Sequence, residues 1–240
     1  MKILITNDDS VSAAQLLPLI RWCRKLGQVE VYVPKFEQSA KSHGIEIRKP
    51  FEVATTELEP GCVVHTVDST PADCVRYALM GDGFRPDLVI SGINRGYNVG
   101  KDIMYSGTCA AIFEAVAQGV PGISISTSPD YYDYATEHLD RIHEFFLTHD
   151  LMGKHMLYNV NIPPQAGEIR ITHQGGPFYS DDFIKLENNM VQPHGRCVYV
   201  PSNDLTLDTN AITAGYISIS PLTINRTDMD MFRSLSHLNP

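Results

Sequence analysis

The sequence predicts an α/β fold: a Rossmann-like, mainly parallel sheet flanked by helices, followed by a β-rich C-terminal extension. Residues 2–6 form a short apolar run that ends at polar turn residues, which is typical of a buried parallel strand. A segment of helical length and then an alternating strand follow it, so residues 2–33 have the strand–helix–strand order of a right-handed βαβ unit. Residues 172–203 alternate aromatic and polar side chains without a helical period, which predicts the extension.

Length and composition favour one large acidic domain over residues 1–240. The 19 Lys and Arg residues against 28 Asp and Glu residues give a net charge of -9, which disfavours binding to nucleic-acid polymers. The cysteines are scattered and form no CxxC pair, so a disulfide framework or a structural zinc site is not expected. The chain opens directly into its first strand, and no apolar stretch approaches the roughly 20 residues of a membrane span. We therefore expect a cytoplasmic protein without a membrane partner.

The first strand–helix–strand unit has clear boundaries. A helix is expected over residues 11–26, where Pro18 either kinks it or delays its start, and a glycine follows its end. Residues 29–33 alternate as the second strand. The polar loop over residues 35–44 leaves the carboxyl end of that strand and carries Ser39 as one of its short oxygen donors. A plain solvated loop is the alternative interpretation.

The middle of the chain repeats the pattern. Residues 45–67 are expected to be strands, and Thr70-Pro71-Ala72-Asp73 begins a helix that runs to about residue 80, with threonine as N-cap and proline at the first helical position. Residues 86–91 form another buried strand. The loop over residues 92–100 is rich in glycine and asparagine, which indicates unusual φ values or a close approach of the backbone to a ligand. Asn94 is expected at the sheet edge where the first strand ends.

Ser106-Gly107-Thr108 stands before a helix of small residues and is a candidate phosphate site. Backbone N–H groups, two hydroxyls and the positive end of the helix over residues 109–116 would come together there. Ordinary helix capping is the alternative.

The rest of the chain completes the core and adds the extension. A strand is expected over residues 122–126, a helix over residues 134–148 and strand-like chain over residues 156–171. The predicted single domain then has a core of about residues 1–171 plus 204–224 and a β-rich arm of about residues 172–203. A terminal helix is expected over about residues 227–238, with Thr227 as its N-cap.

Asp8 and Asp9 directly follow the first strand. In open α/β sheets, ligands bind just beyond the carboxyl ends of the strands. Two carboxylates at that position suit Mg²⁺ or Mn²⁺, which prefer oxygen ligands. The alternative is that Asn7-Asp8-Asp9 caps the following helix, since Asn and Asp are favoured caps. The triplet alone leaves both interpretations open.

A series of motifs in order extends over nearly the whole chain: Ile3-Leu4-Ile5-Thr6-Asn7-Asp8-Asp9, Gln38-Ser39, Thr70-Pro71-Ala72-Asp73-Cys74-Val75, Ser91-Gly92-Ile93-Asn94-Arg95-Gly96, Tyr105-Ser106-Gly107-Thr108, Tyr158-Asn159-Val160-Asn161-Ile162-Pro163 and Gly215-Tyr216-Ile217-Ser218-Ile219-Ser220-Pro221-Leu222. In this order they resemble the SurE family of metal-dependent nucleotidases, phosphatases that act on nucleoside monophosphates. Several motifs together make the resemblance far more specific than any one of them.

The resemblance implies a site and an assembly. It implies one divalent cation per subunit, Mg²⁺ or Mn²⁺, held by Asp8, Asp9, Ser39 and Asn94, with Asp8 and Asn94 as catalytic residues. It implies that the substrate phosphate is bound by Ser106, Gly107 and Thr108, together with Asn98. It also implies a homodimer or homotetramer built with the β-rich arm.

The function expected from the resemblance is metal-dependent hydrolysis of nucleoside 5'-monophosphates, with 3'-monophosphates as further candidates. A phosphatase with an aspartate nucleophile and a nucleotide-binding regulatory protein without turnover are the alternatives. The family usually has glycine at the positions of Ser10 and Ser69, where serine would be strained if the backbone needs a positive φ. The sequence identifies no general acid or base.

Overall fold

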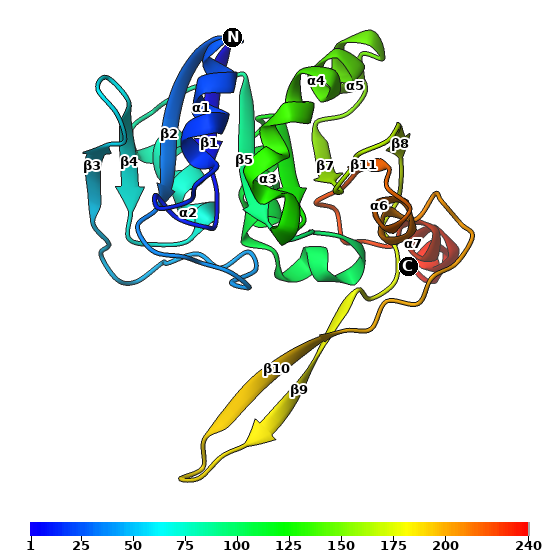
Figure 1. Cartoon of the computed structure of the whole chain (residues 1–240). Helices are drawn as coiled ribbons and strands as arrows, with labels where there is room; N and C mark the ends of the chain where they lie inside the picture. The colour runs from blue at the N-terminus through cyan, green and yellow to red at the C-terminus, as the bar shows by residue number, and fades with distance from the viewer. Residues whose placement is uncertain (240) are drawn as a thin grey trace.

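The computed structural model describes residues 1–239, and its centre is a nine-stranded sheet of order β3-β4-β2-β1-β5-β6-β7-β11-β8 (Figure 1). The strands of this sheet are β1 (Lys2–Thr6), β2 (Gln28–Pro34), β3 (Val53–Glu57), β4 (Val63–Val67), β5 (Leu88–Arg95), β6 (Gly122–Thr127), β7 (Leu157–Ile162), β8 (Ile169–Ile171) and β11 (Ile217–Pro221). The six strands from β4 to β7 in that order are parallel, while β3 and β11 pair antiparallel with their inner neighbours. The predicted Rossmann-like, mainly parallel sheet is confirmed.

The order of the strands reverses direction between β1 and β5. From β1 the chain first builds β2 and β4 on one side and then places β5, β6 and β7 on the other. Ligands of open α/β sheets bind in the crevice that such a reversal leaves beyond the carboxyl ends of the strands. The edge beyond β1 and β5 is therefore the place where this fold positions a site.

Helices cover both faces of the sheet. They are α1 (Leu16–Arg24), α2 (Pro71–Arg76), α3 (Gly107–Ala117), α4 (Leu139–Thr148), α5 (Leu151–Lys154), α6 (Asp208–Thr213) and α7 (Met229–Leu235), with a π-helical turn η1 (Tyr77–Gly81) and 3-10 segments η2 (Gly100–Tyr105), η3 (Pro129–His138) and η4 (Ser236–Leu238). None of these helices is long and apolar enough to cross a membrane.

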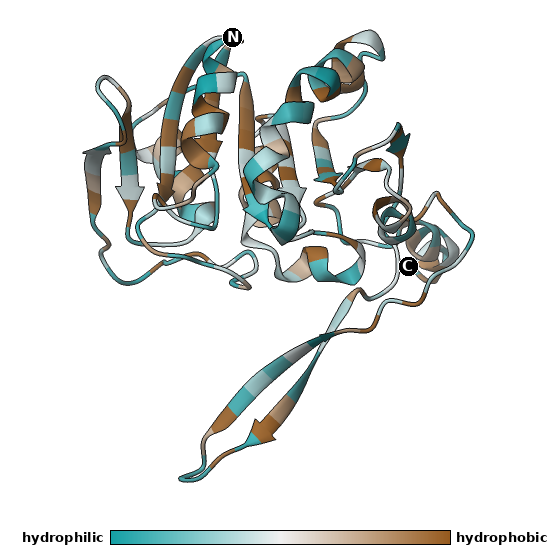
Figure 2. Ribbon diagram, viewed as in Figure 1, coloured by the Kyte–Doolittle hydropathy of each residue, from teal (hydrophilic) through white to brown (hydrophobic). Residues whose placement is uncertain are grey.

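Two apolar clusters hold the layers together. Ile3 and Ile5 of β1 pack with α1 and α4, whereas Leu4 between them packs with α2 and α3 on the opposite face. This alternation is the period of two that a strand imposes on its side chains. Figure 2 accordingly shows apolar residues gathered on the central strands.

Several boundaries differ from the sequence expectations. Helix α1 begins only at Leu16, so Pro18 lies in the first turn, where a missing N–H costs no hydrogen bond, and it delays the helix rather than kinking it. The expected strand over residues 45–52 is absent from the described chain, and the helix over 134–148 begins at Leu139 after the 3-10 segment η3.

Two further expectations are corrected at the C-terminal side. The N-cap of α7 is Asp228, whose carboxylate accepts from the backbone N–H of Met231 at 2.9 Å, and not Thr227. Helix α6 lies where no helix was expected.

The extension is a two-stranded antiparallel hairpin of β9 (Tyr179–Lys185) and β10 (Val191–Cys197). It projects away from the sheet on the side where the parallel strands end (Figure 1). The buried carboxylate of Asp208 ties its base to the body, because it accepts backbone N–H bonds from Gly100 at 2.9 Å and from Gly175 at 2.8 Å. Asp102 adds a bond of 2.9 Å from the backbone N–H of Tyr179.

Candidate active site

The paired aspartates lie in a tight turn directly beyond β1. The amide nitrogen of Asn7 donates to the backbone oxygen of Ser10 at 2.9 Å, and Ser10 has a φ of 73°. Neither aspartate caps the next helix, because the N-cap of α1 is Gln15. The capping alternative for this triplet is therefore wrong, and the turn leaves both carboxylates at the edge beyond β1.

Asp8 is buried and bonded to the start of α3. Its side chain is 4% exposed, and its Oδ1 accepts a 2.5 Å hydrogen bond from the hydroxyl of Thr108. Burial raises the pKa of Asp8 to about 6; the hydrogen bonds from Thr108 oppose the rise, and the charge of Asp9 adds to it. A carboxylate held in this setting attracts either a proton or a cation.

Glycine at position 107 permits the close approach of α3 to Asp8. A Cβ placed on Gly107 would lie 3.0 Å from the Cβ of Asp8 and 3.2 Å from its Oδ2. Ser106 caps the helix through a 3.0 Å bond from the N–H of Cys109 to its hydroxyl oxygen. The capping interpretation therefore holds for the Ser106 side chain. The N–H groups of Gly107 and Thr108, the first two residues of the helix, have no acceptor within the helix, so they remain suited to an anion.

Asp9 lies beside the end of β5. Its Oδ2 accepts a hydrogen bond from the backbone N–H of Arg95 at 3.0 Å, and Arg95 directly follows Asn94 in the chain. Burial raises the pKa of Asp9, the Arg95 N–H lowers it, and the charge of Glu37 raises it. A bulge between Ser91 and Asn94 shifts the register of β5, and the Asn94 amide nitrogen donates to Gly96 O at 2.9 Å. The Asn94 amide oxygen is then the atom available to a cation.

The Ser39 loop runs alongside Asp8. The backbone N–H of Gln38 donates to Asp8 O at 2.8 Å, and Ser42 bonds through its N–H to Tyr105 O at 3.0 Å. Ser39 itself is exposed, and its hydroxyl donates to Glu37 Oε1 at 2.7 Å. The structure thus brings the loop to the aspartates and shows the Ser39 hydroxyl bonded within the loop.

Asn98 is buried and fixed by strand β7. Its amide nitrogen donates to Ser126 Oγ at 2.8 Å, and its backbone oxygen accepts from the amides of Asn159 at 2.7 Å and Asn161 at 3.0 Å. Sequence reasoning missed the role of this asparagine pair. The signal was present, because two asparagines spaced by two residues point to the same face of a buried strand.

The donor chemistry of these residues fits a hard cation. Two carboxylates, a hydroxyl and an amide are all oxygen ligands of the kind that Mg²⁺ and Mn²⁺ prefer. Within residues 1–239 no three His, Cys, Asp or Glu side chains are arranged to hold a metal ion. A cation at the paired aspartates would therefore depend on the neutral oxygens of Ser39 and Asn94.

Comparisons with known proteins identify the family of the chain. The family model described as "Survival protein SurE" matches residues 3–181. Proteins named "5'-nucleotidase SurE" from Fervidobacterium nodosum and Herpetosiphon aurantiacus are 34% and 35% identical, over 98% of this chain and over 96% and 97% of their own lengths. A crystal structure of the SurE protein from Aquifex aeolicus covers 99% of each chain at 26% identity, with a TM-score of 0.78. The chain therefore belongs to the SurE family of survival proteins.

Proposed function

We propose that this protein is a metal-dependent phosphatase that hydrolyses nucleoside 5'-monophosphates to nucleoside and phosphate. The observation that carries this proposal is the hydrogen bond from Thr108 to Asp8, which joins the acidic pair to the N-terminus of α3. An oxygen-rich cation site and an anion-binding helix end thus share one edge of the sheet. The relatives named 5'-nucleotidase support the substrate class.

The cation would be held by Asp8, Asp9, Ser39 and Asn94. When bound there, Mg²⁺ or Mn²⁺ supplies charge neutralisation for the phosphate ester and lowers the pKa of water. Asp8 and Asn94 are the proposed catalytic residues: Asp8 follows β1 and Asn94 lies in β5, the two strands that flank the reversal point.

The substrate phosphate would bind at the first turn of α3. The helix end and the N–H groups of Gly107 and Thr108, with Ser106 as the cap beside them, favour negative charge, and Asn98 retains one amide N–H beyond the bond to Ser126. In the net reaction a new bond forms between water oxygen and phosphorus, and the ester bond to the nucleoside breaks. The nucleoside oxygen leaves with a proton.

Phosphate release from AMP with Mn²⁺, with Mg²⁺ and with a chelator tests the proposal. We expect release with either metal, none with chelator, and recovery when metal is restored. A nucleotide-binding protein without turnover would bind AMP and release nothing. Parallel assays with 3'-AMP measure whether both phosphate positions are accepted.

Water is the proposed nucleophile, rather than an aspartate. In aspartate-nucleophile phosphatases the acid usually lies two residues beyond the nucleophile, and here Ser10 occupies that position with a φ of 73°. Borohydride trapping during turnover should therefore leave Asp8 and Asp9 unreduced. Reduction of either to the alcohol would establish an aspartyl-phosphate route instead.

We also propose a homodimer or homotetramer. All residues of β9 and β10 are exposed, including Phe183 at 68% and Val191 at 56%. An isolated two-stranded hairpin is marginally stable in water, and α7 has no buried residue either. A second subunit covering these elements would remove that exposure.

A cytoplasmic location is proposed as well. The five cysteines are all free, and four of them are buried. Free thiols without disulfide partners suit a reducing compartment.

A further inference from the structure

We infer that Glu37 is a positioning residue that orients the Ser39 hydroxyl toward the divalent cation. This inference deepens the proposed function and rests on it, because Ser39 matters only if a cation binds beside Asp8. None of the motifs that define the family resemblance includes Glu37.

The contact itself assigns the direction of the hydroxyl. Ser39 Oγ donates its single proton to Glu37 Oε1 at 2.7 Å. A serine hydroxyl has one donor and two acceptor lone pairs, so fixing the proton on Glu37 also fixes where the lone pairs point. The serine oxygen binds a cation through a lone pair. Without the hydrogen bond to Glu37, the side chain of an exposed serine would rotate freely between three rotamer wells.

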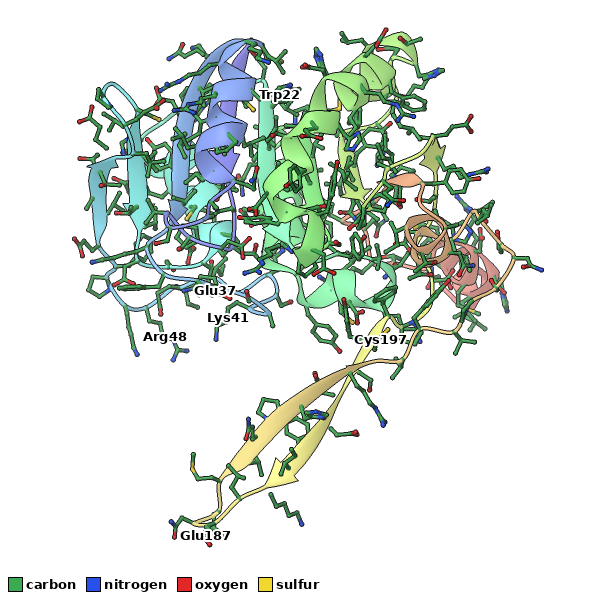
Figure 3. All side chains as sticks on the ribbon, viewed as in Figure 1. Trp22, Glu37, Lys41, Arg48, Glu187 and Cys197 are labelled. Carbon is green, nitrogen blue, oxygen red and sulfur yellow. The ribbon has the colours of Figure 1, made fainter. Side chains whose placement is uncertain are left out.

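The position of Glu37 relative to the acidic pair supports the same role. The Gln38 N–H bond to Asp8 O, at 2.8 Å, places the segment from Glu37 to Ser39 directly against the turn of the aspartates. Figure 3 shows Glu37 at the edge of the molecule where the parallel strands end.

Glu37 is not itself placed as a ligand. It does not form a cluster of three acidic side chains with Asp8 and Asp9 that could hold a metal ion within residues 1–239. Its carboxylate instead supports a ligand through a hydrogen bond, as outer partners of metal sites do. Removal of such a partner typically weakens metal affinity by 10–100-fold.

Mn²⁺ titration of the metal-stripped full chain by calorimetry tests the inference with four variants. Glu37→Ala should weaken Mn²⁺ binding by about 10–100-fold. Glu37→Gln keeps an acceptor oxygen for Ser39 and should stay within about fivefold of the wild type, since a lost exposed charge counts little. Ser39→Ala should weaken binding, and adding Glu37→Ala to it should weaken binding no further. The unfolding temperature should be the same in all four.

Glu187→Ala is the matched control, because it removes an exposed glutamate at the tip of the hairpin, far from the site (Figure 3). Wild-type affinity in Glu37→Ala, equal losses in the Ala and Gln variants, or additive losses in the double variant would each overturn the inference. If the Mn²⁺ pattern appears and AMP is not hydrolysed, the role of Glu37 stands and the nucleotidase proposal fails. If the wild type binds no Mn²⁺, both fail.

Discussion

At the scale of single residues, the buried carboxylate of Asp8 serves the proposed cation site but lowers the stability of the metal-free protein at neutral pH. Its pKa of about 6 lies above the ordinary value of 3.8, so the folded protein binds a proton more tightly than the unfolded chain. Its contribution to stability is fully present below pH 4 and is lost as the pH rises through 6. In the metal-free protein at pH 7 this loss amounts to about 3 kcal/mol.

We predict that Asp8→Asn raises the free energy of unfolding of the metal-free protein at pH 7 by up to about 3 kcal/mol, because it removes the buried charge. The same variant should lose turnover and bind Mn²⁺ weakly. Urea unfolding in chelator at pH 4 and pH 7 measures the first effect, and calorimetry measures the second. An unchanged Mn²⁺ affinity would remove Asp8 from the ligand set.

The family usually has glycine at positions 10 and 69, and only Ser10 has the positive φ that strains a residue with a Cβ. Ser10 has a φ of 73°, and Ser69 is absent from the residues with positive φ in the described chain. The Ser69 hydroxyl instead donates to Asp73 Oδ2 at 2.6 Å. The two departures from the family pattern therefore have different consequences for the backbone.

Ser10→Gly should stabilise the protein by up to about 1 kcal/mol, since glycine adopts a positive φ without a Cβ penalty. Ser10→Ala is the control: it keeps the Cβ, loses the 3.3 Å bond from the Ser12 N–H, and should destabilise. Chemical denaturation of both variants measures the difference. A clear loss of stability in the glycine variant would show that the serine hydroxyl holds the turn.

At the scale of elements, the loop over residues 35–44 is anchored to α3 by a side-chain pair. His43 Nε2 lies 2.9 Å from Glu114 Oε2, and Glu114 is 5% exposed with further bonds to Arg76 and Gln118. The anchor joins the loop that carries Ser39 to the helix that begins at Gly107. The position of the loop thus depends on the same helix as the candidate phosphate site.

His43→Ala should increase amide hydrogen exchange in residues 36–44 and lower the free energy of unfolding by about 1 kcal/mol, the usual net value of one hydrogen bond. Glu114 keeps two partners, so exchange within α3 should not change. Lys41→Ala, an exposed substitution in the same loop, is the control. Unchanged exchange in the loop would show that its backbone bonds alone hold it.

The elements with strong local signals were predicted well. The β1 turn and the helix start at Thr70 and Pro71 follow from the apolar run and the capping residues, and Thr70 does accept from the Asp73 N–H, at 3.2 Å. The extension of β5 through Asn94 was missed because glycines suggested a loop, while pairing with β6 carries the strand onward through a bulge. Local chemistry does not reveal such pairing.

The side chains of the candidate site were predictable by type but not by contact. Asp8 and Asp9 stand out in sequence because two carboxylates follow a strand. The bond from Thr108 to Asp8 joins residues 100 positions apart, and only the folded sheet brings them together. Nothing in the sequence singles out Glu37 as part of the site, since a glutamate in a polar loop is usually solvated.

At the scale of the whole molecule, the exposed hairpin predicts association. We expect light scattering at micromolar concentration to find a dimer or tetramer, and Phe183→Asp to shift it toward monomer, because a charge would be buried in the interface. Glu187→Ala at the hairpin tip is the control. Monomer alone in the wild type would contradict the proposed assembly.

The ties at the base of the hairpin restrict how the protein can be shortened in the laboratory. Asp208 holds Gly175 and Gly100 with one carboxylate, and Gly100 lies two residues from Asn98. Trimming the whole arm over residues 172–203 would remove Gly175 and also the 2.7 Å bond from the Gln174 amide to Gly100 O, and so would weaken the hold on the loop that leads to the site. A truncation that replaces only the hairpin between Tyr179 and Cys197 with a short turn would leave both N–H bonds to Asp208 in place, and it is the cut that an engineer seeking a smaller enzyme should make first.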